Sequence, residues 1–365
     1  MGDAIPQGLD FAFCLGTLVN RPHLNVFSGA LLSLMATLSW AKDPQTSFQE
    51  AKECDADKKN VGEEICRLPL QSAYLTQYSV GDLAAECKKN KIAHYVDEYL
   101  KKNPDKTPLD GLTDYLWNKS DSEGPYVPFI IGPNKAFYVT DHHHLGTAVW
   151  RYAEENDLDI KNIFLRAGRK EVTHGSADWR EDFRDKNGKI DYTAFWAAMK
   201  NHNNAWFYDN NGDPLPYDKS LENPRGPFPE NFSKTHNDPY RSISRWLRAA
   251  CGYLKQDADC PTSFGEAKKS DYMEYRWANY VRDMMKDKVK GKNLHNKEER
   301  KDEEKLLWAQ YPSALDALLK HREAKNYFSF NWNVDVDDYG FNNTGNHYSI
   351  KKINDHFCEV VDDHT

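Results

Sequence analysis

The four consecutive residues Asp141-His142-His143-His144 are the part of the sequence best suited to chemistry. Imidazole titrates near neutral pH and can act as an acid, a base or a metal ligand, and a carboxylate beside it can cap a helix or orient a ring nitrogen. Neighbouring side chains point in different directions, so at most two of the three imidazoles are expected to converge on one ion or substrate. The alternative interpretation is a surface turn with a capping aspartate and incidental histidines.

The segments around this turn predict a strand that leads directly into a helix. Residues 126–131 and 136–140 are short β-prone runs joined by a turn at 132–135, which indicates a β-hairpin, and helical character begins at Leu145. The first turn of such a helix exposes N–H groups, where an anion meets hydrogen-bond donors and the positive end of the helix dipole. We therefore expect the Asp-His-His-His turn to line a phosphate-binding site.

Further elements are predicted along the chain. Asp238 and Pro239 have the residue types of a helix N-cap and first helical position. The order of elements predicts an α/β (α+β) fold, with a small mixed sheet and helices extended by additional N- and C-terminal helices. Besides the hairpin, a strand is expected at 160–166, helices at 80–102, 192–202, 239–254 and 271–283, and a charge-dense helical stretch at 284–310.

We expect four segments. Residues 1–41 read as a signal peptide, because the apolar run at 26–40 has the length of a signal-peptide core and is too short for a confident membrane span. Residues 42–123 form a helical and loop-rich extension that contributes the opening strand and helices, 124–282 form the catalytic-type domain, and 283–365 form a charged helix and a C-terminal extension packed on the core.

The cysteines and glycosylation sequons agree with export. Removal of residues 1–41 leaves six cysteines, an even set that an oxidising compartment can pair. A Cys54–Cys66 bridge would suit the loop-rich segment at 42–68, although spacing alone does not determine connectivity. We expect a secreted, disulfide-bonded glycoprotein; the alternative is a cytosolic protein with free thiols. The sequons begin at Asn118, Asn231 and Asn342.

The charge balance limits the partners. The formal net charge is −8, from 48 basic and 56 acidic side chains, so no long-range field would gather the protein onto a nucleic acid or an anionic membrane. A protein that coats nucleic acid is therefore disfavoured, and a small-molecule or other phosphate-containing substrate is expected. The composition sets no oligomeric state.

Several ordered segments carry a resemblance to a known family. They are PFIIGPNKAFYVTDHHHL at 128–145, AFWAAM at 194–199, NDPYRS at 237–242, and the runs at 245–253 and 275–282, preceded by Leu75-Thr76-Gln77 and Val80-Gly81. In this order they resemble the ParB-like nuclease family, a branch of the superfamily that contains the ParB N-terminal domain, sulfiredoxin and the free-serine kinases. The resemblance implies an α/β fold in which a D-G-H-H-R-like turn binds phosphate at a helix N-terminus, with catalytic residues beside it.

Asp141, His143 and His144 match catalytic positions of this motif, so the resemblance implies a catalytic role for them. It also implies that the turn, which continues into Gly146, binds phosphate. His142 stands where the motif has glycine, and Leu145 stands where it has arginine. His142, Leu145 and Gly146 are therefore the expected phosphate-binding positions within the turn.

The missing arginine requires another cation. Arg241, Arg245 and Arg248 share one face of the helix predicted at 239–254, and we expect Arg241 or Arg245 to supply the charge from that helix. The alternative is a solvated arginine stripe.

Three functions follow as hypotheses. The first is an exported enzyme that acts on a phosphate-containing substrate, such as a metal-assisted phosphodiesterase or nuclease, with His142, His144 and His174 as ligands of a divalent ion. The second is a nucleotide-dependent phosphotransferase similar to the serine kinases, which the absent motif arginine disfavours. The third is a metal- or ligand-binding module without turnover.

Overall fold

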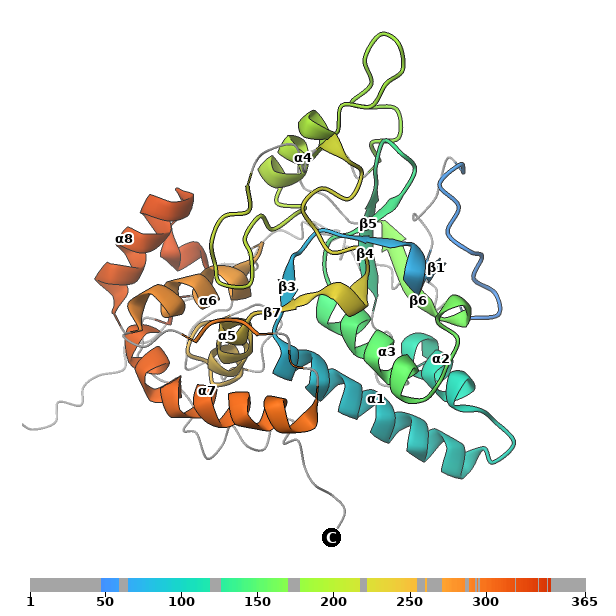
Figure 1. Cartoon of the computed structure of the whole chain (residues 1–365), viewed down its shortest axis with the longest axis horizontal. Coiled ribbons are helices and arrows are strands. Elements are labelled where there is room, and N and C mark those ends of the chain that lie inside the picture. Colours follow the sequence, from blue (N-terminus) through green and yellow to red (C-terminus); the bar gives the residue numbers. More distant parts are fainter. Residues whose placement is uncertain are drawn as a thin grey trace, which may run out of the picture. The chain divides into compact units, whose positions relative to one another are not determined.

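The structure is a computed structural model (Figure 1). It describes residues 47–58, 65–118, 126–169, 178–216, 222–254, 260, 271–285, 289–292, 294, 296–318, 320–333, 335–339 and 341–342. The predicted signal peptide and His174 lie outside the described residues. Of the helices that are described, none combines the length and the apolar character needed to cross a bilayer.

A five-stranded mixed sheet lies at the centre of the first core. Its order is β1-β6-β4-β5-β2, and β4 and β5 form the predicted antiparallel hairpin. Strands β2 and β5, and β4 and β6, are parallel, whereas β1 and β6 are antiparallel. The mixed sheet is therefore confirmed. The strands are β1 (Cys66–Pro69), β2 (Ala73–Leu75), β4 (Val127–Ile131), β5 (Phe137–Val139) and β6 (Phe164–Arg169).

The hairpin turn follows from two residues with special backbone requirements. Lys135 has a φ of 61° and its N–H donates to the carbonyl of Gly132 at 2.9 Å, which closes the turn. A Cβ at Gly132 would lie 2.2 Å from the ring of Tyr138, so only glycine fits there without movement of that ring. Strand β5, which follows the turn, ends at Val139, shortly before α3 begins at His143.

Three helices pack with the sheet in the first core. They are α1 (Asp82–Lys102), α2 (Pro108–Asn118) and α3 (His143–Glu155), and α1 contacts both α2 and α3 (Figure 1). The helix α4 (Tyr192–Asn201) joins the same core through Phe195, Trp196 and Met199, which are buried as their spacing predicts.

A second hydrophobic core lies among helices α5 to α8. The helices are α5 (Pro239–Ala249), α6 (Met273–Met284), α7 (Lys297–Leu318) and α8 (His321–Trp332). Trp277 and Tyr280 of α6 are fully buried in this core, and Trp246 of α5 stacks on Trp308 of α7 with ring centroids 4.4 Å apart. Burial of such large aromatic side chains is the main source of stability for this helical layer.

A two-stranded parallel sheet joins the two cores. Strand β3 (Ser79–Val80) pairs with β7 (His236–Asn237), immediately before the starts of α1 and α5 respectively. Asp238 caps α5 as predicted, because its side chain accepts the N–H of Tyr240 at 3.0 Å. The first turns of α1 and α5 consequently lie near each other.

Some predicted boundaries are wrong, and long-range contacts explain the largest shift. Residues 160–162 form a 3₁₀ helix, since Asp159 accepts the N–H of Lys161, and the strand starts at 164. Helix α5 ends at Ala249 instead of 254, α6 stops at Met284 and α7 begins at Lys297, and the described residues between α6 and α7 are not helical. Between them, the N–H of Val289 donates to the Tyr240 hydroxyl at 3.1 Å, so a tertiary contact replaces a helical hydrogen bond there.

Candidate functional site

The start of α3 has a strained backbone. His142 occupies the N-cap position with a φ of 64°, in the left-handed region that favours glycine. The exposed Asp141 does not cap the helix; its carboxylate accepts the N–H of His142 at 2.6 Å. The left-handed conformation gives a physical reason for the glycine that the family motif has at this position.

His143 is buried and neutral. Its Nε2 accepts the backbone N–H of Thr76 at 3.3 Å, so the ring proton is on Nδ1. Burial lowers the pKa of His143 to about 3, against the opposing effect of Asp141. The Nδ1 atom is itself buried and has no hydrogen-bond partner. His143 therefore offers a hydrogen-bond donor and is a weak base at neutral pH.

The ring of His144 also accepts a backbone N–H, from the residue that follows strand β3. Its Nε2 accepts the N–H of Gly81 at 3.0 Å, which again leaves the proton on Nδ1. Burial, and then the nearby Arg241, keep the pKa of His144 well below its ordinary value. The backbone N–H groups of Thr76 and Gly81, which follow strands β2 and β3, thus set the tautomers of both imidazoles.

Leu145 and Gly146 pack against apolar neighbours. Their N–H groups donate to the carbonyl of His142 at 2.9 and 3.1 Å. The Leu145 side chain is fully buried in the first core, and a Cβ on Gly146 would lie 2.2 Å from the ring of Phe232. The residue at the position of the motif arginine therefore lies in the hydrophobic core of this chain.

Arg241 is buried beside the histidines, so the solvated-stripe alternative is wrong for it. Only 3% of Arg241 is exposed. Its Nη2 lies 3.1 Å from a carboxylate oxygen of Glu274, and its guanidinium lies over the Tyr275 ring, 3.0 Å from the centroid. Its Nε and Nη1 atoms have no hydrogen-bond partner. Two strong donors are consequently left unused in a buried position.

Arg241 belongs to a group of cations around one carboxylate, which we name the cationic cluster: Lys88, Arg241, Arg245 and Arg248 with Glu274. Arg248 also pairs with Glu274, at 2.8 Å. Although burial opposes ionisation, Arg241 and Arg248 hold the pKa of Glu274 well below its ordinary value. Burial, and then Arg245, lower the pKa of Lys88 to about 8. Helix α5 contacts both α1 and α6, which brings these side chains within electrostatic range of one another.

The cationic cluster contains more positive charge than its carboxylate neutralises. Glu274 has ion-pair contacts with Arg241 and Arg248. For Lys88 and Arg245, no hydrogen bond or ion pair within 4.0 Å to a carboxylate is found among the described residues. Burial lowers the pKa of Arg245 as well. A buried excess of cations is costly unless an anion compensates it.

Tyr272 and Tyr275 complete the surroundings of the turn. The hydroxyl of Tyr275 donates to the side-chain carbonyl of Gln77, and the buried hydroxyl of Tyr272 has no partner. The charge of Asp141 contributes to raising the pKa of each hydroxyl, after the larger effect of burial. The two tyrosines therefore lie near the carboxylate of the turn.

Several of these residues were not predicted as site residues from the sequence. Gln77, Gly81 and Tyr275 lie in segments that resemble the family, which was the signal available for them. Lys88 and Glu274 lie inside amphipathic helices and gave no such signal, because only the packing of α1 and α6 against α5 brings them to Arg241.

The structure bears on one residue of the expected metal ligand set, His144. The Nε2 of His144 is occupied by the Gly81 N–H, and its Nδ1 carries the proton, so neither nitrogen offers a lone pair. Within the described ranges no three His, Cys, Asp or Glu side chains form a group that could hold a metal ion, and His174 lies outside those ranges. His144 is therefore unsuited as a metal ligand in this arrangement.

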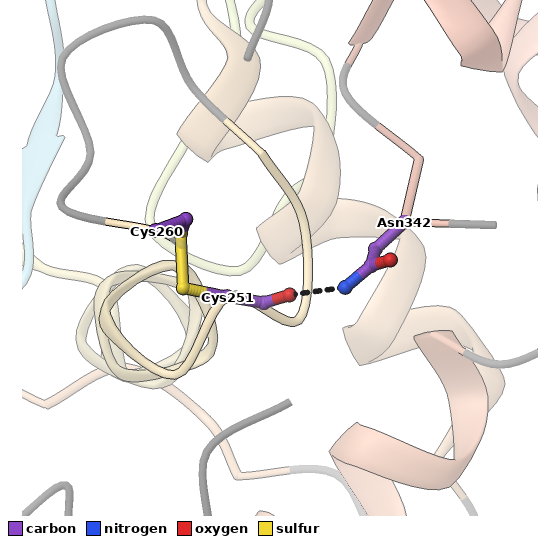
Figure 2. The surroundings of a disulfide bond; sticks show 3 residues. All are labelled: Cys251, Cys260 and Asn342. Atoms are coloured by element: carbon purple, nitrogen blue, oxygen red, sulfur yellow. Dashed lines mark hydrogen bonds between the residues drawn. A yellow bond between two sulfur atoms is a disulfide. The ribbon is translucent and has the colours of Figure 1, made fainter. Parts of the chain in front are cut away.

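Two disulfides are formed by described cysteines. Cys54 bonds to Cys66, as the loop-rich segment suggested, and Cys251 bonds to Cys260. Figure 2 shows that the side chain of Asn342 donates from Nδ2 to the carbonyl of Cys251, at 2.7 Å. Because an N-linked glycan is attached through Nδ2, this buried sequon is unsuited to glycosylation in the folded protein. Asn118 is exposed at the end of α2.

Comparison with known proteins gives a family and a distant structural match. The crystal structure of protein Atu1540 from Agrobacterium tumefaciens matches with a TM-score of 0.43 and 18% identity, over 72% of this chain and 95% of that one. The search of curated proteins finds no match. The family described as "Putative ParB-like nuclease" matches residues 66–283, which is more than half of the chain. The protein therefore belongs to the ParB-like nuclease family.

Proposed function

We propose that this protein binds a phosphate group between the start of α3 and the cationic cluster, and that it acts on a phosphate-containing substrate. The observation that carries the proposal is the state of Arg241, which is buried with two unpartnered donor nitrogens. Such donors match the oxygen atoms of phosphate in geometry and charge. The excess charge from Lys88 and Arg245 supports an anionic ligand.

The proposed reaction is hydrolysis of a phosphate ester. Asp141, the exposed carboxylate of the turn, takes the proton of a water molecule whose oxygen attacks phosphorus. The bond between phosphorus and the ester oxygen breaks, and that oxygen takes a proton from solvent. The Nδ1–H groups of His143 and His144 and the guanidinium of Arg241 stabilise the negative charge that develops on the phosphoryl oxygens.

Export is part of the same proposal. Two disulfides among described cysteines are typical of an oxidising compartment, in agreement with the signal peptide predicted at 1–41. Nucleoside triphosphates are scarce outside cells, so export favours hydrolysis over phosphotransfer from a nucleotide.

A binding module without turnover is the second candidate. The observation that favours it is that the imidazoles of the buried His143 and the half-buried His144 have lowered pKa values and accept backbone N–H groups, which leaves little capacity for proton transfer. Phosphate binding would be retained in this case, and hydrolysis would be absent.

Phosphate release from p-nitrophenyl phosphate and bis(p-nitrophenyl) phosphate tests the proposal, together with cleavage of plasmid DNA with and without EDTA. Asp141→Asn is expected to lower kcat by about 100-fold or more, and Arg241→Gln to raise KM. Asp105→Asn is the matched control, since Asp105 is exposed and distant in sequence from the site. Saturable phosphate binding without hydrolysis would select the binding module; absence of both binding and hydrolysis would overturn the proposal.

A further inference from the structure

We infer that the site prefers a terminal phosphate with two negative charges to the singly charged phosphodiester of a nucleic-acid backbone. The inference rests on the proposed function and narrows its substrate class to phosphomonoesters. It is drawn from the number of cations and donors in the cationic cluster, and it runs against the activity that the family description suggests.

The cationic cluster has more positive than negative charges. Glu274 is shared by Arg241 and Arg248 through its two carboxylate oxygens. Lys88 and Arg245 remain without a carboxylate partner in the described part of the chain. With four cations and one carboxylate, the cluster has an excess of three positive charges. A phosphodiester would compensate one of these charges, whereas a phosphomonoester, with about 1.5 to 2 negative charges at pH 7, compensates up to two.

The unused donors are the second argument. The Nε and Nη1 atoms of Arg241 and the hydroxyl of Ser242 are buried and have no partner. The Ser242 hydroxyl lies 2.7 Å from the position that a Cβ on Gly81 would take, and the N–H of Gly81 holds His144. Unused donors therefore occur at the point where α1, α3 and α5 meet. A terminal phosphate presents three free oxygens to such donors, whereas a diester presents two.

Isothermal titration calorimetry of the full chain with methyl phosphate and dimethyl phosphate at pH 7.5 tests the inference. These ligands share the phosphate and differ by one methyl group and one charge. Methyl phosphate is expected to bind at least about tenfold more tightly. Arg245→Gln and Lys88→Gln are expected to bring the two affinities toward equality. Lys101→Gln on the same helix as Lys88 is the control, because Lys101 is exposed, and it should preserve the preference.

The outcomes separate this inference from the proposed function. Equal affinities of the unaltered protein for the two ligands would overturn the preference and leave phosphate binding in place. Binding of neither ligand would overturn the proposed function and the inference together. Circular dichroism of each variant establishes that it is folded, and if one of the two cluster variants is unfolded the other supplies the comparison.

Discussion

Two buried or half-buried polar clusters lie near the starts of α1, α3 and α5, and they differ in how completely their charges are paired. In the cationic cluster, Glu274 pairs with Arg241 and Arg248, and the other two cations lack a carboxylate partner among the described residues. The second group, which we name the carboxylate cluster, consists of Asp82, Asp238 and Glu303. Arg151 donates to Asp82 at 2.6 Å, Arg282 to Asp238 at 2.5 Å, and Asn237 to Glu303 at 2.7 Å.

The difference separates structural roles from functional ones. Arg151 and Arg282 also have an unused donor atom, so the contrast lies in the charges. A buried network whose charges are paired makes the surrounding elements rigid, whereas one with an excess of cations has capacity for an anionic ligand. The carboxylate cluster joins the two cores, because Asn237 also accepts the N–H of Asp82 at the start of α1. Substitutions in the carboxylate cluster should therefore act on stability, and those in the cationic cluster on binding.

The largest effect is expected from Asp238→Ala. The substitution leaves the buried Arg282 without its carboxylate partner and removes the N-cap of α5. The free energy of unfolding should fall by about 3–5 kcal/mol, as measured by urea denaturation. Asp105→Ala, at an exposed position, should change it by less than about 0.5 kcal/mol. A loss of similar size in both variants would remove the structural role of the carboxylate cluster.

The raised pKa of Glu303 leads to a prediction for how the stability of the protein depends on pH. Burial raises the pKa of Glu303 from 4.5 to about 8. Because the folded-state pKa is the higher one, the protonated carboxyl stabilises the fold below pH 4.5, and this contribution is lost as the pH rises through about 8. The loss should be on the order of a few kcal/mol. Denaturation midpoints of Glu303→Gln between pH 5 and 9 should show a flatter profile than the unaltered protein; parallel profiles would contradict the assignment.

A smaller effect on stability is expected at the start of α3, where the backbone of His142 is strained. His142→Gly relieves the left-handed conformation at the start of α3 and should stabilise the protein by about 1 kcal/mol. His202→Gly is the matched control, because His202 has a φ of −95° and should show no gain. Thermal unfolding of the two variants gives the comparison, and a gain at position 202 alone would contradict the account of strain.

The smallest change in stability is expected from Arg245→Met. Removal of one cation from a cluster with excess positive charge should alter the free energy of unfolding by less than about 1 kcal/mol in phosphate-free buffer. The added stability that phosphate confers on the unaltered protein should largely disappear in the variant. Thermal shifts with and without phosphate measure both quantities. A strong destabilisation without phosphate would show that Arg245 is structural, as in the carboxylate cluster.

Local signals predicted the elements that present the turn, and long-range packing determined the rest. The hairpin, the start of α3 and the Asp238 cap follow from residue types within a few positions of one another. The burial of Arg241 could not be predicted, because it depends on Glu274 and Tyr275, more than 30 residues away. The sequence identified the missing arginine at Leu145, but only the fold shows that this position faces the first core.

The Cys54–Cys66 disulfide has a consequence for the outer strand of the sheet. Strand β1 ends the five-strand order, and its open side is occupied by the preceding segment, since the N–H of Arg67 donates to Lys52 and the N–H of Cys54 donates to Arg67. The disulfide fastens that segment in place. In a reducing environment the covering segment would be released, and the bare strand would become a template for pairing between molecules. We therefore expect this disulfide to protect the edge of the sheet against aggregation, at a place remote in sequence from the histidines.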